Sequence, residues 1–151
     1  GINDLPRARS MLRPGAKVVY LLDNCGESVL DRLLVHELRA LGARVTGVVK
    51  GAPILTDVTM EDAVRAGLDK CFDEVLSTAS FAVGIDMARV PSRLKAEMRE
   101  ADLIVSKGMA NLESLSDEDC RPILYLLRAK CDPVSRLIGA GRNQNVARLC
   151  E

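Results

Sequence analysis

Tryptophan is absent from this 151-residue sequence, which has only two Phe, two Tyr and one His. So few aromatic side chains leave little surface on which bases could stack, and 21 basic residues are balanced by 21 acidic ones, so no nucleic-acid partner is predicted. No apolar run approaches the roughly 18 residues of a membrane-spanning helix, so no membrane partner is expected. The single histidine, His36, disfavours a histidine-based metal cluster and a Ser-His-Asp triad.

Disulfide and cofactor-loop patterns are also missing. The five cysteines are odd in number, scattered along the chain and never in a CxxC spacing. This usage is typical of reduced thiols in a cytoplasmic protein, and not of a disulfide framework or a zinc site. Neither a Walker A loop nor a GxGxxG fingerprint occurs, which disfavours P-loop nucleotide binding and a conventional nicotinamide enzyme.

What the sequence does contain is a series of apolar runs that alternate with helical patterns. Strands are predicted at residues 17–23, 44–50, around 74–76, 102–106 and 122–127. Helices are predicted at residues 26–41, 60–66, 92–101, 111–115 and 133–138. This alternation indicates βαβ units, so the predicted fold class is α/β with a mostly parallel sheet.

The length corresponds to one domain. Residues 1–16 show little periodicity and are interpreted as a lead-in, a remnant of a helical segment of a longer protein, followed by the α/β domain at residues 17–151. Thr59 is predicted to cap a helix with Asp62 in a capping box, and Ser92 to cap the helix that follows it. Residues 139–151 are polar and weakly patterned, so residues 122–127 form the last clear strand.

Polar residues follow the apolar strands. Those at or just past strand ends are Asp23, Asn24, Glu27, Lys50, Asp57, Ser106, Lys107, Asn111, Arg128 and Lys130. The carboxyl ends of parallel strands share one rim, where ligands bind. Asp and Asn oxygens suit Mg²⁺ or Mn²⁺, and lysines and helix N-termini bind phosphate. The pattern therefore predicts a site for a phosphate group and a divalent metal.

Simpler interpretations of the same residues stay open. Asp23 and Asn24 are residue types that cap a helix, and Asp57 suits a turn. Lys50 and Lys107 suit solvated strand ends, because lysine is seldom fully buried.

Four segments, in order, resemble motifs of one family. Residues 23–27, Asp-Asn-Cys-Gly-Glu, resemble the DNxGE motif of the metal-dependent damage-control phosphatases, also known as domain of unknown function 89 and as acidic-residue-methyltransferase-like. Residues 49–63 resemble the family's VKGxPxxxDxTxxDA block and residues 101–113 its ADLxxSKGxxNxE block. Residues 123–131 are similar to its closing strand.

The resemblance implies a three-layer α/β/α sandwich with a Rossmann-like sheet. It implies a divalent metal ion (Mn, Co, Ni or Mg) held by Asp23, Asn24 and Asp57, with Asp23, Asn24 and Lys107 as the catalytic residues. The residues implied to bind phosphate or substrate are Glu27, Lys50, Ser106, Gly108 and Asn111. The implied activity is metal-dependent hydrolysis of phosphate monoesters, the partner being a small phosphorylated metabolite such as a sugar phosphate or a damaged phosphometabolite.

Two other functions are kept as alternatives. A nucleotide- or metabolite-binding module without catalysis would still bind its ligand after chelation of metals. A carboxyl methyltransferase, suggested by the family's other name, ranks last because no glycine-rich methyl-donor loop follows the first strand.

Overall fold

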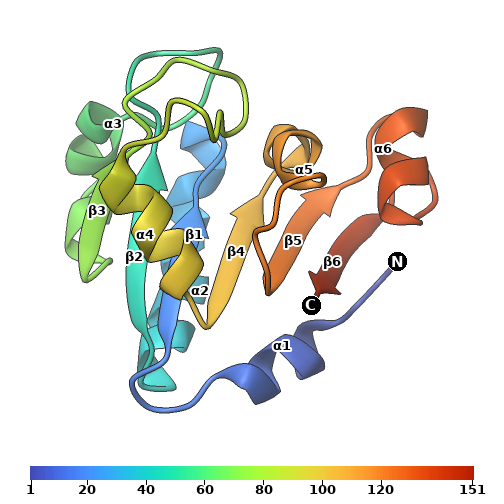
Figure 1. Cartoon of the computed structure of the whole chain (residues 1–151), viewed down its shortest axis with the longest axis horizontal. Helices are drawn as coiled ribbons and strands as arrows, with labels where there is room; N and C mark the ends of the chain where they lie inside the picture. The colour runs from blue at the N-terminus through green and yellow to red at the C-terminus, as the bar shows by residue number, and fades with distance from the viewer.

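The computed structural model describes all residues from 1 to 151 (Figure 1). One sheet contains six strands in the order β3-β2-β1-β4-β5-β6. The strands are β1 (Lys17–Leu21), β2 (Arg44–Val49), β3 (Glu74–Ser77), β4 (Leu103–Lys107), β5 (Ile123–Arg128) and β6 (Asn145–Cys150). The first five are parallel, and β6 pairs antiparallel with β5. The predicted α/β class and mostly parallel sheet are confirmed.

Helices cover both faces of this sheet. They are α1 (Leu5–Met11), α2 (Cys25–Ala40), α3 (Met60–Arg65), α4 (Ser92–Glu100), α5 (Met109–Leu115) and α6 (Asp132–Ile138), with a short 3-10 helix at Leu68–Lys70. Buried side chains of α1, α2 and α3 share one hydrophobic cluster, and those of α4, α5 and α6 share a second cluster on the opposite face. The three-layer α/β/α sandwich is therefore confirmed.

Strand β1 shows why the apolar runs are continuous. Val18 and Tyr20 belong to the first cluster, whereas Val19 and Leu21 belong to the second. All four are at most 1% exposed. A strand that is buried on both faces needs apolar residues at every position, which removes the alternation typical of a half-exposed strand.

The strand order reverses at β1, which lies between β2 and β4. The chain leaves β1 toward α2 on one face, whereas β4 leads into α5 on the other face. The connections after these two strands therefore diverge and open a crevice at their carboxyl ends. Open α/β sheets bind their ligands at such a point.

Helix starts are partly as predicted. The Thr59–Asp62 capping box is confirmed, since the Thr59 side chain accepts from the Asp62 backbone and the Asp62 side chain accepts from the Thr59 backbone. The prediction that Ser92 caps α4 is wrong. Pro91 occupies the N-cap position in an extended conformation and Ser92 is already helical, without a side-chain capping bond.

The prediction that residues 122–127 form the last clear strand is wrong, because β6 follows in the weakly patterned tail. Val146, Ala147 and Leu149 are buried, but the exposed Arg148 interrupts the apolar run. On one side β6 pairs with β5 over its whole length, and on the other side it forms only an isolated bridge from Ala147 to Asn3, so its local pattern is the weak one of an edge strand.

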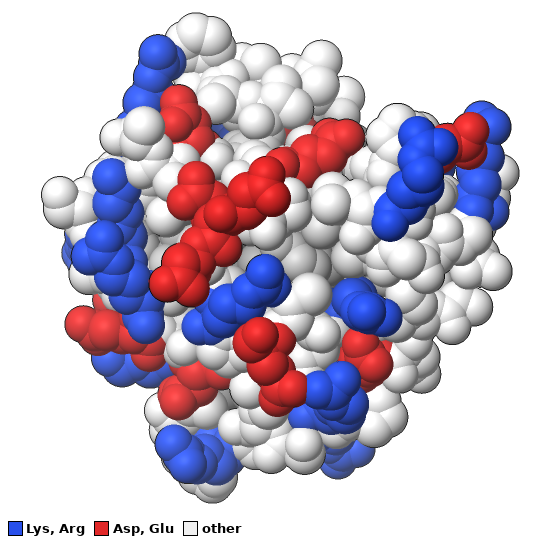
Figure 2. Space-filling model, turned by 45° about the vertical axis from the view of Figure 1, so that its right-hand side comes forward, with Lys and Arg blue, Asp and Glu red and all other residues white.

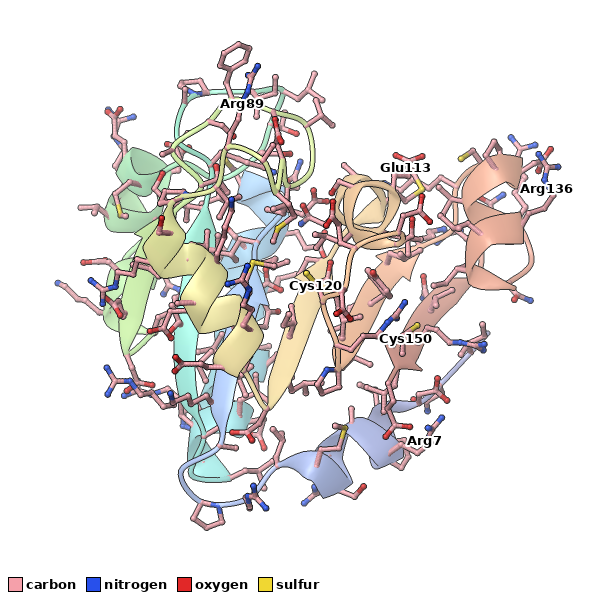
Figure 3. The ribbon with its side chains drawn as sticks, in the orientation of Figure 1. Arg7, Arg89, Glu113, Cys120, Arg136 and Cys150 are labelled. Atoms are coloured by element: carbon pink, nitrogen blue, oxygen red, sulfur yellow. The ribbon has the colours of Figure 1, made fainter.

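Residues 1–16 are more structured than their weak periodicity suggested, because they include α1. The backbone of Asp4 donates to Ala147 of β6 at 2.7 Å, and Arg7 forms an ion pair with Glu151 at the C-terminus. Arg7 projects from α1 near this end of the chain (Figure 3). That residues 1–16 derive from a longer helical segment stays a prediction.

No helix of the structure combines the length and the apolar composition that crossing a membrane requires. All five cysteines are free, and Cys120 and Cys150 lie on separate segments, one before β5 and one in β6 (Figure 3).

Candidate active site

A polar cavity of about 450 Å³ lies at the carboxyl ends of β1, β4 and β5. Its charged lining residues are Asp23, Glu27, Asp57, Lys107, Arg128 and Lys130. A second cavity of about 510 Å³ lies between α1 and α2, but nine of its 13 lining residues are hydrophobic. The polar cavity brings acids and a lysine together at the carboxyl ends of several strands, where open α/β sheets bind their ligands, so it is the candidate site.

Asp23 and Asp57 are brought together by backbone pairing across the loops. The Val58 backbone donates to the Asp23 carbonyl at 2.9 Å, and the Cys25 backbone donates to the Thr56 carbonyl at 2.8 Å. Asn24 and Asp57 consequently form an isolated antiparallel bridge. The loop after β2 thus runs beside the loop after β1, and two carboxylates that are 34 positions apart line one cavity.

Asn24 caps α2 as well as lying beside the two acids. Its side-chain oxygen accepts from the backbones of Gly26 at 2.8 Å and Glu27 at 3.4 Å, and its amide nitrogen donates to Thr56 at 2.6 Å. The capping interpretation is confirmed for Asn24. Since the second bond is long, the amide oxygen retains acceptor capacity for another ligand.

Burial changes the proton affinity of Asp23 and Asp57, and neighbouring acids add to the change at Asp23. Burial, the Asp57 carboxylate and the Glu27 carboxylate raise the pKa of Asp23 to about 6, against the opposing charge of two lysines. Burial also raises the pKa of Asp57, although the Lys50 ammonium acts in the opposite direction. The ionised form of these carboxylates is disfavoured mainly because they are buried, and a bound cation would relieve this penalty.

Lys107 is buried and paired with two acids of α2. Its ammonium lies 2.7 Å from Asp31 and also forms an ion pair with Glu27. The Tyr20 hydroxyl donates to the same Asp31 oxygen at 2.8 Å. Burial lowers the pKa of Lys107, but the hydrogen bonds and charges of Asp31 and Glu27 outweigh it, so the pKa is raised above its ordinary value.

Lys50 is buried too, but it does not line the cavity. Its ammonium donates to the Gly84 carbonyl and is 3.9 Å from Asp57. Burial lowers the pKa of Lys50, more strongly than Asp57 and Asp23 raise it. The interpretation of Lys50 and Lys107 as solvated strand ends is wrong for both residues.

Gly108 is required where β4 meets the site. Its φ is +79°, and a Cβ atom built there would lie 2.0 Å from a carboxylate oxygen of Asp23. A side chain at this position would displace Asp23, so the absence of one lets the β4 loop approach the acids.

Ser106 and Asn111, both predicted to bind phosphate, are buried and do not line the cavity. The Ser106 hydroxyl has no hydrogen-bond partner. The Asn111 amide donates to the carbonyls of Leu22 at 3.3 Å and Lys107 at 2.8 Å. Asn111 therefore ties the end of β1 to the end of β4, which orients the site from behind.

Asp31 was missed by the sequence reasoning. It is 6% exposed and lies one helical turn after Glu27, so both acids face Lys107 from the same side of α2. The available signal was a single acid in register with Val35 and Leu38 on the buried face of α2. An acid at such a position needs a buried partner.

The charges around the cavity are unevenly distributed. The carboxylates of Asp23, Glu27, Asp31 and Asp57 gather with Lys50 and Lys107 near the ends of β1, β2 and β4, whereas Arg128 and Lys130 line the cavity from the end of β5. Figure 2 shows a band of acidic side chains crossing one face of the molecule, with basic side chains below the band and beyond its upper end.

This donor set fits a divalent cation. No group of three or more His, Cys, Asp or Glu side chains is placed to bind a metal together. Asp23 and Asp57 line the cavity, whereas Asn24, which is bridged to Asp57 through the backbone, does not line it and caps α2 with its amide oxygen. Carboxylate and amide oxygens are the hard ligands that Mg²⁺ and Mn²⁺ prefer.

Comparison with known proteins assigns the family. Residues 1–146 match the damage-control phosphatase ARMT1-like domain. The chain belongs to this family. It is 46% identical over 150 residues to a damage-control phosphatase of Archaeoglobus fulgidus, covering 99% of this chain and 51% of the relative. It is 35% identical over 136 residues to a damage-control phosphatase of Pyrococcus horikoshii, covering 89% of this chain and 47% of that relative.

A solved structure supports the same membership. The crystal structure of a DUF89 family protein from Pyrococcus horikoshii superposes with a TM-score of 0.92 at 32% identity, covering 98% of this chain and 52% of that chain. The resemblance to the damage-control phosphatases is thereby confirmed. The chain spans about half the length of the relatives that it matches.

Proposed function

We propose that this damage-control phosphatase domain hydrolyses phosphate monoesters with the help of a divalent metal ion. The observation that carries the proposal is the convergence of Asp23, Asp57 and Lys107 at one cavity from three different strand ends. Acids that bind a cation, beside a lysine that binds an anion, are what phosphoryl transfer to water requires. The names of the relatives from Archaeoglobus and Pyrococcus support the same activity.

In this proposal Asp23, Asn24 and Asp57 hold the cation, which when bound supplies Lewis-acid polarisation of a phosphoryl oxygen. Dependence on a cation follows from the grouping of Asp23, Glu27 and Asp57 on one side of the cavity, where these carboxylates would otherwise repel a phosphate dianion. Mn, Co, Ni and Mg are the candidate ions, since Asp and Asn oxygens accept all four.

The residues of the chain have separate tasks at the phosphate. Lys107 lies at the cavity wall and stabilises the charge that develops on the phosphoryl oxygens. Gly108 has no side chain that would stand between a ligand and Asp23. Asn111 fixes the distance between the ends of β1 and β4 through its bonds to Leu22 and Lys107. Glu27 faces the same space and competes with the phosphate for Lys107.

The substrate class is a small phosphorylated metabolite. The cavity volume of about 450 Å³ suits a molecule of sugar-phosphate size. Arg128 and Lys130 at the end of β5 line the same cavity and add positive charge at its mouth, which attracts a dianionic substrate.

The test is turnover of sugar phosphates with Mn²⁺, Co²⁺, Ni²⁺ or Mg²⁺, before and after chelation. The Asp23→Ala variant should lose at least about 100-fold in rate, because it loses both a cation ligand and the central carboxylate. Asp117→Ala is the matched control, since Asp117 is exposed and lies outside the cavity.

Three outcomes would contradict the proposal. Turnover by Asp23→Ala at the parent rate would remove Asp23 from the site. Ligand binding that survives chelation without any turnover would favour a binding module. Binding of S-adenosylmethionine would favour a carboxyl methyltransferase.

A further inference from the structure

The two acids that hold Lys107 differ in their access to solvent. The Glu27 side chain is 49% exposed and lines the cavity, whereas that of Asp31 is 6% exposed and does not line it. A ligand entering the cavity reaches Glu27 and Lys107 before it can reach Asp31. Glu27 is therefore free to leave Lys107 for solvent, and Asp31 is not.

Asp31 has a second buried partner that fixes it in place. The Tyr20 hydroxyl donates at 2.8 Å to the same oxygen that Lys107 contacts at 2.7 Å. Tyr20 is fully buried within β1, next to the strand that carries Lys107. The Asp31 carboxylate is consequently held between Tyr20 of β1 and Lys107 of β4, and it does not line the cavity.

We propose that Asp31 is a positioning residue that keeps the Lys107 ammonium at the cavity wall, while Glu27 is a placeholder that an incoming phosphate displaces. This inference rests on the proposed function. When phosphate binds, the Lys107 ammonium exchanges its contact with Glu27 for one with the phosphate and keeps its contact with Asp31. Tyr20 supports the arrangement by fixing the Asp31 oxygen.

The physical reason is the cost of separating buried charges. An ammonium group has three donors, so it can bond to Asp31 and to one further anion at the same time. If Asp31 were neutral, Glu27 would be the only counter-charge of a largely buried lysine, and its displacement would be costly. With Asp31 ionised, the exchange of Glu27 for phosphate leaves the buried pair intact.

Two isosteric variants separate this inference from general electrostatics. Asp31→Asn and Glu27→Gln each remove one negative charge that contacts Lys107. If only net charge mattered, both would bind a phosphate dianion more tightly. Positioning by Asp31 instead gives opposite signs: Asp31→Asn weakens binding about tenfold or more, and Glu27→Gln binds at least as tightly as the parent.

The experiment is calorimetric titration of the 151-residue protein and both variants with inorganic phosphate in the presence of Mn²⁺. Tighter binding by Asp31→Asn would overturn the inference, as would weaker binding by Glu27→Gln. A parent protein that does not bind phosphate would also overturn it. Phosphate binding without turnover would count only against the proposed hydrolysis.

A second readout needs neither metal nor turnover. The ¹H–¹⁵N spectrum of the lysine ammonium groups should contain a protected Lys107 signal in the parent and in Glu27→Gln, and should lose it in Asp31→Asn. A Lys107 signal that persists in Asp31→Asn would assign Asp31 a purely structural role. Should Asp31→Asn not fold, Tyr20→Phe decides the question: two- to threefold weaker phosphate binding supports the inference, and unchanged binding overturns it.

Discussion

The same pair of residues, lysine and then glycine, stands at the carboxyl ends of β2 and β4, yet the surroundings of the two pairs differ. Lys50 and Lys107 are 3% and 7% exposed. Lys50 contacts a backbone carbonyl and is 3.9 Å from one acid, whereas Lys107 pairs with two acids. Burial lowers the pKa of Lys50, but the two acids raise that of Lys107. Two lysines at the carboxyl ends of parallel strands therefore differ in their partners and in the direction in which their pKa is shifted.

The glycines that follow differ in the same way. A Cβ atom on Gly51 would lie 2.3 Å from the Ser80 backbone nitrogen, whereas one on Gly108 would meet the Asp23 carboxylate. The Gly51 backbone also donates to the Ser80 carbonyl at 2.9 Å. The end of β2 thus anchors the neighbouring loop, while the end of β4 forms a wall of the candidate site.

The largest expected difference is in turnover of Lys107→Met and Lys50→Met. Lys107→Met should lose at least about 100-fold in rate, because the ammonium faces the phosphoryl group. It should also lose about 3 kcal/mol of unfolding free energy, since Asp31 loses its buried counter-charge. Lys50→Met should lose less than about tenfold in rate and about 1 kcal/mol, since a carbonyl loses its donor.

Steady-state kinetics with a sugar phosphate and urea unfolding measure both quantities. Equal loss of turnover in the two variants would remove the distinction between the two strand ends. A Lys107→Met protein with full turnover would exclude Lys107 from the chemistry.

The glycines should give the next largest effects. Gly51→Ala should destabilise the fold by about 2–3 kcal/mol, because its methyl group meets backbone that cannot move aside. Gly108→Ala should cost about 2–3 kcal/mol, because a φ of +79° with a ψ of 168° is a conformation that only glycine adopts readily. It should also weaken Mn²⁺ binding about tenfold, because the displaced atom belongs to Asp23.

Urea unfolding and calorimetric titration with Mn²⁺ separate the two cases. The contrast fails if Gly51→Ala weakens metal binding as much as Gly108→Ala does.

The smallest effect concerns Asp23, which lies between the two lysines. Its pKa is about 6 in the folded protein and about 3.9 in an unfolded chain. Between these values the folded state binds more protons, so without metal its contribution to the unfolding free energy falls as pH rises, by about 1–2 kcal/mol after allowance for partial exposure.

Urea unfolding of the chelated protein between about pH 4 and pH 6.5 tests this sign. The Asp23→Asn variant should lack this decline, whereas Asp117→Asn should retain it. Saturating Mn²⁺ should reverse the decline, because metal binding requires the ionised carboxylates. An unfolding free energy whose pH dependence is the same in Asp23→Asn and the parent would contradict the elevated pKa.

Several elements were predictable because their signals are local. Continuous apolar runs marked the five parallel strands, and Thr59 with Asp62 marked the start of α3. Strand β6 was not predictable, since its stability comes from pairing with β5, and an exposed arginine interrupts its apolar pattern. Of the predicted site residues, Asp23, Glu27, Asp57, Lys107 and Gly108 share the cavity. Their roles stay predictions.

The sequence by itself determined where the parallel strands end and which polar residues follow them, because apolar runs and helix caps depend only on residues that are close together in the sequence. Only the tertiary structure decided what each strand end contacts. Whether a lysine meets a carbonyl or two carboxylates depends on the strand order and on the helix packed against that strand. Asp31 illustrates the point: it contacts Lys107, 76 positions away, because α2 packs beside β1 and β4.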